Sequence, residues 1–273
     1  MTGAGVRRAG RREAGATRSL VRRQAWALAG VALALFAVLR IVLGPLPQWP
    51  SYHDLADTRV LGGMPRAGDV LTNLAILAAG LWGATLGPRL AADDDERVAW
   101  RWLVGATIAT ALGSGWYHLD PSNATLVWDR LPMALVMAAL LALVLADRVD
   151  ARFGREALAP FGLVGVASVV WWAATDAMGR DDLTLYAIVR VGTGVAVLGL
   201  LILRRGRTRG SGWLWAAIAL DVAMTLVERQ DRAVWDATGG LASGHNLKHL
   251  MAGGVLACVF VWLTHRAPRT PVG

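Results

Sequence analysis

The grouping of the apolar residues is the feature that most constrains this chain. They fall into eight runs of about 17 to 25 residues, the length that a helix needs to cross a bilayer. Inside a bilayer the backbone cannot bond to water, so each run must form a helix that satisfies its own hydrogen bonds. The runs lie at roughly 25–46, 69–88, 99–118, 126–146, 157–174, 183–203, 212–228 and 245–264.

Short loops separate these runs, which predicts that neighbouring helices pack antiparallel in one bundle. The many glycines and alanines in the runs suit the close approach of helices in lipid. We therefore expect an all-α, polytopic transmembrane helical bundle. The first run is too long for a signal peptide and no small-residue cleavage site follows it, so we expect a helix that stays in the protein.

The net charge of +8 is unevenly placed, because seven arginines lie in the first 24 residues, just before an apolar run. This arrangement is typical of a cytoplasmic anchor. A nucleic-acid-binding tail is the alternative, but no aromatic residues lie between the arginines to stack on bases. Arginine also favours alternate loops, which predicts cytoplasmic termini. Arginine replaces lysine everywhere except at Lys248, which with the many alanines indicates a bacterial protein of the inner membrane.

Three histidines lie at the ends of runs that this topology places on the outer side. His245 and His249 are one helical turn apart, so both rings can reach one metal ion, and His118 ends another run. Three imidazoles with a fourth position left for water are the pattern of catalytic zinc. Interfacial histidines bonded to backbone or lipid headgroups are the alternative. Cys258 is the only cysteine, so a cysteine-based zinc site is excluded.

Two polar residues accompany His118 in the sequence. Ser114 precedes it by four residues and so shares its helix face, and Asp129 follows it by eleven. A carboxylate at the membrane edge is costly unless it is paired or functional. The alternatives for Asp129 are an ion pair with Arg130 or a charge at a helix N-terminus. Elsewhere, we expect Glu228 and Asp231 to pair locally with Arg229 and Arg232.

Three segments carry a pattern seen in a known family: Gly113–His118, Trp128–Met133 and His245–His249. A serine four residues before a histidine, an aspartate about eleven after it and a late HxxxH resemble the alkaline ceramidases, whose superfamily includes adiponectin-type receptors. The resemblance covers about residues 49–264 and implies a seven-helix core there. It leaves 25–48 as an extra N-terminal helix, 1–24 as a basic cytoplasmic tail and 265–273 as a second tail.

The resemblance implies zinc held by His118, His245 and His249, Asp129 as a proton shuttle and Ser114 near the metal. The implied reaction hydrolyses the N-acyl bond of ceramide or a related N-acyl lipid to a fatty acid and a sphingoid-type amine. The expected partners are that lipid and the bilayer, and no nucleic acid. The alternatives are a receptor-like or regulatory protein with structural zinc, and a haem-binding electron-transfer protein.

An acidic segment before the second run suggests a further cation. Its hard oxygen donors suit calcium, which the resemblance also places there. The chain departs from the family pattern because Arg59 stands where an oxygen ligand is expected. A salt-bridge cluster with Arg59 and Arg66 is therefore the alternative to a calcium site. The candidate calcium ligands are Asp54, Asp57, Asp69 and Asn73.

Overall fold

The structure, a computed structural model, describes the chain in segments separated by short gaps. The chain divides into two units, Met1–Pro45 and Leu46–Gly273, and the helices discussed below belong to the second. The basic tail at 1–24, most of the predicted helix at 25–46 and most of the tail at 265–273 lie outside the described residues. Those residues are 37–38, 40–42, 44–87, 90, 94–204, 206 and 208–266.

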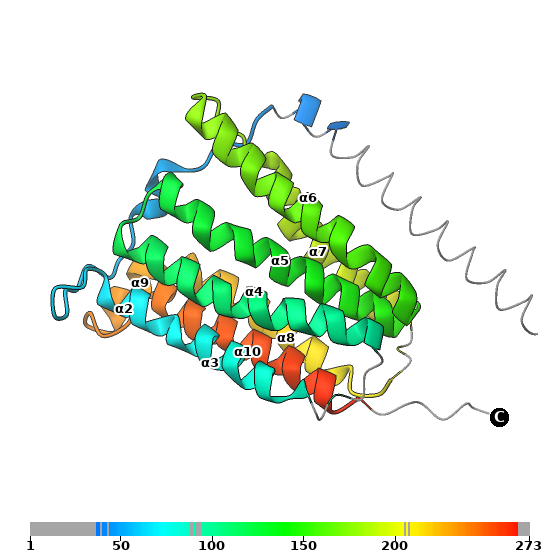
Figure 1. The fold of residues 1–273 in the computed structure, drawn as a ribbon. Coiled ribbons are helices and arrows are strands. Elements are labelled where there is room, and N and C mark those ends of the chain that lie inside the picture. The colour runs from blue at the N-terminus through cyan, green and yellow to red at the C-terminus, as the bar shows by residue number, and fades with distance from the viewer. Residues whose placement is uncertain are drawn as a thin grey trace, which may run out of the picture. The chain divides into compact units, whose positions relative to one another are not determined.

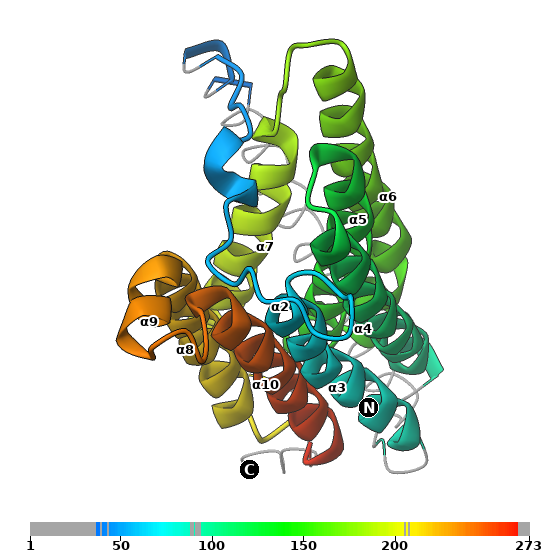
Figure 2. The same ribbon diagram turned by 90° about the vertical axis from the view of Figure 1, so that its left-hand side faces the viewer.

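The described part of the second unit is helical throughout and contains no strand, as Figures 1 and 2 show. Two short helices accompany the long ones, η1 (Pro50–His53) and α9 (Asp231–Ala237). A single turn residue, Asn73, separates α2 (Ala67–Thr72) from α3 (Leu74–Thr85). The long helices are α4 (Asp94–Leu119), α5 (Asn123–Arg148), α6 (Ala151–Ala177), α7 (Thr184–Leu203), α8 (Gly212–Glu228) and α10 (Gly244–Thr264).

Five helical segments are long and apolar enough to cross a membrane, which indicates an integral membrane protein. The helices also expose apolar side chains on their outer faces, as lipid-facing helices do. Leu163 on α6 is 71% exposed and Val191 on α7 is 64% exposed. The five segments are Ala67–Thr85, Asn123–Arg148, Ala151–Ala177, Thr184–Leu203 and Gly244–Thr264.

The packing order follows the chain for the middle helices and closes with the last one. Helix α4 packs along both α3 and α5, and α7 packs on α5 and α6. Helix α10 packs between α3 and α8, so the last helix lies beside the first one of the bundle (Figure 2). This closure brings the start of α10 beside α2 and the end of α4.

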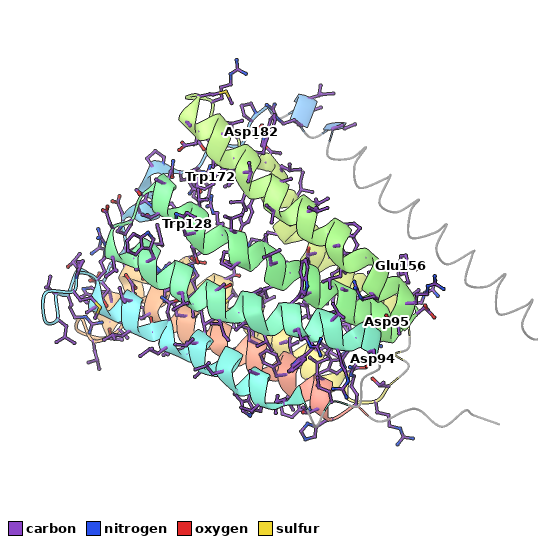
Figure 3. All side chains as sticks on the ribbon, viewed as in Figure 1. Asp94, Asp95, Trp128, Glu156, Trp172 and Asp182 are labelled. Atoms are coloured by element: carbon purple, nitrogen blue, oxygen red, sulfur yellow. The ribbon has the colours of Figure 1, made fainter. Side chains whose placement is uncertain are left out.

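Figure 3 shows which residues lie at each end of the bundle. Asp94, Asp95 and Glu156 lie towards one end, and Trp128, Trp172 and Asp182 lie towards the other. At the end with Asp94, the guanidinium of Arg266 binds the buried carboxylate of Glu96 with two bonds of 3.0 and 3.2 Å, joining α10 to α4. The histidines lie at the opposite end.

Candidate metal centre

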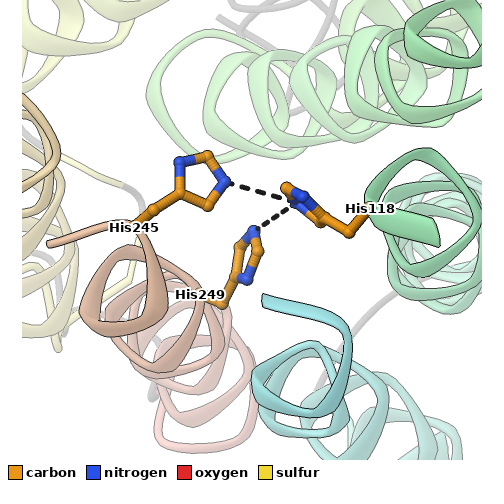
Figure 4. Close-up of side chains that lie close together, drawn as sticks. All are labelled: His118, His245 and His249. Atoms are coloured by element: carbon orange, nitrogen blue, oxygen red, sulfur yellow. Dashed lines mark hydrogen bonds between the residues drawn. The ribbon is translucent and has the colours of Figure 1, made fainter. Parts of the chain in front are cut away.

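His118, His245 and His249 converge at one point between α4 and α10 (Figure 4). The Nε2 atom of His118 lies 3.3 Å from the Nε2 atom of His245 and 3.3 Å from that of His249. All three side chains are buried. Among the described residues, these three form the one group of three or more histidine, cysteine or acidic side chains placed to hold a metal ion.

The spacing of the nitrogens fits a tetrahedral metal ion. An ion with metal–nitrogen bonds of about 2.0–2.1 Å at tetrahedral angles holds its ligand nitrogens about 3.3–3.4 Å apart. The two separations from His118 Nε2, each 3.3 Å, match that value, and ligand atoms of all three residues lie within 4.8 Å of one another. Three imidazoles leave a fourth position, which is the composition of a metal site that binds water or substrate.

Local contacts at the start of α10 place two of the ligands. Ser243 and Asn246 form a capping box, in which each side chain accepts the backbone N–H of the other residue at 3.0 Å. The carboxylate of Asp231 accepts the backbone N–H of His245 at 2.7 Å and that of Ala56 at 2.8 Å. These bonds fix the first turn of α10, and with it the rotation of His245 and His249.

The outward-facing nitrogens of the three rings have different surroundings. Nδ1 of His249 lies 3.0 Å from the Thr72 hydroxyl. Nδ1 of His245 lies 3.7 Å from a carboxylate oxygen of Glu228, which is too long for a hydrogen bond. Nδ1 of His118 is buried and has no hydrogen-bond partner in the described part of the chain.

Ser114 on α4 and Asp129 on α5 meet where the two helices pack, and the Ser114 hydroxyl interacts with the Asp129 carboxylate. Both are buried. Because Ser114 lies one turn before His118 on α4, this interaction directs the Asp129 carboxylate towards the helix face that carries this ligand. The predicted pair is therefore brought together beside the histidines.

The alternative ion pair between Asp129 and Arg130 is absent from the ion pairs of the described residues. Arg130 instead lies in an aromatic box, with its Cζ atom 4.2 Å from the ring centroid of Trp172 and 5.1 Å from that of Tyr186. Its NH2 group donates to Gln48. Arg130 thus ties the start of α5 to α6 and α7, and Asp129 stays free of a direct cationic contact.

The local pairing expected for Glu228 and Asp231 is wrong. Glu228 accepts a 2.6 Å bond from Lys248, the only lysine of the chain, which lies on α10 between the two histidines. Asp231 binds backbone N–H groups, as described above. Both carboxylates connect distant segments because their partners come close only when α8, α9 and α10 pack together.

The four candidate calcium ligands have different surroundings, and the buried Asp69 Oδ2 and Asn73 Oδ1 atoms have no hydrogen-bond partner among the described residues. Asp57 is fully buried and receives two bonds from the Arg59 guanidinium, of 2.9 and 2.5 Å. Burial alone would raise the pKa of Asp57, but the bonds from Arg59 hold that pKa below its ordinary value of 3.8. Asp69 accepts from Asn246 at 2.6 Å, Asn73 donates to the Asp69 backbone and Asp54 is exposed. The calcium site stays a prediction, and the cation that the structure places on Asp57 is Arg59.

No protein-family model matches this chain, and no curated protein matches its sequence. The fold and the site therefore define the class: an all-helical membrane protein with a buried three-histidine site for a metal ion. Sequence reasoning missed Thr72 and the contacts of Glu228 and Asp231. For the contact between Lys248 and Glu228, the one available signal was the position of Lys248 within the HxxxH segment.

Proposed function

We propose that this chain is an integral-membrane, zinc-dependent amidase that hydrolyses the N-acyl bond of ceramide or a related N-acyl lipid. The products are a fatty acid and a sphingoid-type amine. The observation that carries the proposal is the convergence of three histidine side chains near the interacting pair of Ser114 and Asp129. The sequence resemblance to the alkaline ceramidases supports it.

Zinc is the metal that the donor set favours, because three imidazole nitrogens at tetrahedral spacing suit it. When bound by three neutral imidazoles, zinc lowers the pKa of a water ligand to about 7 and polarises a carbonyl oxygen. The helices exclude bulk solvent from His118, His245 and His249, so the metal would lie in a dry site where charge interactions are strong.

Asp129 supplies the proton transfers that amide hydrolysis needs. Its carboxylate accepts a proton from the attacking water and returns one to the departing amine nitrogen. The Ser114 hydroxyl interacts with this carboxylate and so orients it. If the hydroxyl rotates towards the substrate, it donates instead to the oxygen on which negative charge develops.

In this proposal two further helices join the five segments that are long and apolar enough to cross a membrane. From Trp102 to Leu119, α4 carries no Asp, Glu, Lys or Arg, and α8 carries only Asp221 before its final Glu228. With these two, residues 49–264 form a seven-helix core, and 25–48 add one helix. The arginine distribution places both termini in the cytoplasm and the histidines at the outer face of a bacterial inner membrane.

The two alternatives make different demands on the site. A haem iron needs axial ligands on opposite faces of its ring, whereas the three imidazoles have centroids only 4.7 to 4.9 Å apart, with no room for a porphyrin between them. A receptor-like protein with structural zinc needs no general base. The buried Ser114 and Asp129 pair near the histidines favours the enzyme.

The test is a screen of N-acyl lipids with the full chain purified in detergent. Fatty acid and amine are measured by mass spectrometry for the purified protein, after chelation and after zinc is restored. We expect equimolar release of the two products that is lost on chelation and recovered with zinc. His265→Ala should keep the activity of the parent protein, because His265 is an exposed histidine after the end of α10 and lies outside the metal cluster. A zinc-loaded protein that releases no amine from any N-acyl lipid would reject the proposal.

A further inference from the structure

The side of His249 that faces away from the cluster meets the last turn of α2. The hydroxyl oxygen of Thr72 lies 3.0 Å from His249 Nδ1 and 2.7 Å from the backbone carbonyl oxygen of Gly68. A hydroxyl has one proton, and a carbonyl can only accept. The Thr72 proton is therefore directed at Gly68, and an oxygen lone pair faces His249.

A second acceptor lies on the same side of the ring. The backbone carbonyl of Asp69 lies close to His249 and 3.3 Å from the Thr72 hydroxyl oxygen. Because the Thr72 proton is directed at Gly68, the Thr72 oxygen can only accept from the ring, so Nδ1 of His249 must carry the ring proton. A neutral imidazole has one N–H group, so Nε2 is left with its lone pair, and Nε2 is the atom that faces His118 at 3.3 Å.

We propose that Thr72 is a positioning residue of the metal centre, whose hydroxyl holds the Nδ1 proton of His249 and so keeps Nε2 as the metal-binding atom. Metal-binding histidines commonly donate their second nitrogen to such a partner, which fixes the tautomer and the ring orientation. Of the three ligands, His249 is the one whose Nδ1 atom has a partner at hydrogen-bond distance in the described part of the chain. The inference rests on the metal-binding part of the proposed function alone.

The contacts of α2 with α10 explain why Thr72 reaches this ring. Asn246, three residues before His249, donates to the Asp69 carboxylate at 2.6 Å, so the same face of α10 meets α2 at two successive positions. Further along, a side chain at Gly253 would come within 2.8 Å of the Ala75 backbone. The absence of a side chain there allows α10 to lie close to α3, which continues from Thr72.

The experiment compares three variants of the full chain in detergent. Thr72→Val removes the hydroxyl and keeps the shape, and Thr72→Ser keeps the hydroxyl. Thr110→Val is the matched control, because Thr110 on α4 makes the same bond to a carbonyl one turn earlier, at 2.8 Å, and has no bond to a histidine. Zinc affinity is measured by competition with a chromophoric chelator.

Loss of such a partner typically weakens metal binding about 10- to 100-fold. We expect Thr72→Val to lie near the tenfold end of that range, because the Asp69 carbonyl remains as an acceptor. Thr72→Ser and Thr110→Val should bind zinc as tightly as the parent. Equal affinities for Thr72→Val and Thr110→Val would overturn the proposal.

A second measurement is made on the unmodified protein and does not depend on how the Thr72 variants fold. Nitrogen-15 NMR of the metal-free, histidine-labelled chain, with the His249 signals assigned by their loss in His249→Gln, reports which nitrogen carries the proton. We expect the proton on Nδ1; a proton on Nε2 would overturn the proposal. If both results appear but no N-acyl lipid is hydrolysed, the role of Thr72 stands and the proposed reaction fails.

Discussion

A side chain on Gly113 of α4 would collide with the backbone carbonyl of Trp128 on α5. The two helices therefore touch at this point without a side chain between them. Ser114 and Asp129 are the next residues on their respective helices, and the contact lets their side chains interact. The absence of a side chain at Gly113 thus allows the close helix contact that the proposed catalytic pair needs.

Gly113→Ala should separate the two helices and weaken the interaction between Ser114 and Asp129. Inserting a methyl group into a packed contact typically costs about 1–3 kcal/mol. We expect a lower midpoint of thermal unfolding in detergent and a loss of amidase activity, with zinc still bound. Gly105→Ala is the matched control on the same helix, because a side chain there meets no atom within 4 Å. If the two variants unfold at the same temperature, the proposed close contact is wrong.

Metal analysis should find about one zinc ion per purified chain, since the three imidazoles form one site. His249→Ala should lose most of this zinc because only two of the three imidazole ligands remain. The triple alanine variant of His118, His245 and His249 should lose all of it. The measurement is the zinc-to-protein ratio of the parent and of each variant after identical purification. Full zinc in the triple variant would show that the metal lies elsewhere.

The pH dependence of stability should depend on Asp57. Its pKa is lower in the folded chain than its ordinary value of 3.8, so the unfolded chain binds a proton first as the pH falls. The stabilisation is therefore complete above pH 3.8 and is lost as the pH falls through the folded pKa. Asp57→Asn should lower stability at neutral pH and make stability less sensitive to acid. Unfolding midpoints between pH 7 and pH 3 measure both effects.

The control for this prediction is Asp54→Asn, which removes a carboxylate three residues earlier that is exposed to solvent. Surface changes of this kind typically alter stability by at most about 0.5 kcal/mol. An Asp57→Asn variant with the acid sensitivity of the parent would show that the Arg59 pair does not contribute as described.

The topology prediction comes from the arginine distribution. A reporter fused to the C-terminus should be active on the cytoplasmic side, and one inserted near Gly240 should be active on the opposite side. Gly240 lies in the loop between α9 and α10, close in sequence to His245. Reversed reporter signals would move the metal centre to the cytoplasmic face of the membrane.

The sequence predicted most helix positions because long apolar runs are a strong signal. It placed the start of several helices too late, at the edge of the apolar run. Helix α4 begins at Asp94 and not near residue 99, because acidic residues suit a helix N-terminus. Helix α6 begins at Ala151 and not near residue 157, because the Asp150 side chain caps it by accepting the Phe153 N–H at 3.2 Å. Polar turns extend a helix beyond the segment that hydropathy detects.

The candidate site was predictable where it depends on spacing along one helix. His245 and His249 are four residues apart, and so are Ser114 and His118, which fixes their shared faces. Contacts between helices carry no such signal. Thr72 meets His249 across 177 positions of sequence, and the two residues come together only when α10 packs against α2 and α3.

The most direct measurement of the central claim compares Asp129→Asn with the parent protein on a verified N-acyl lipid. Asparagine keeps the shape and can still accept a hydrogen bond from Ser114, but it cannot carry a proton at neutral pH. We expect equal zinc content in the two proteins and an initial rate of amine release about 10² to 10⁴ times lower in Asp129→Asn. Ser114→Ala should reduce the rate less. Amine release by Asp129→Asn at the parent rate, with zinc intact, would contradict the proposed mechanism.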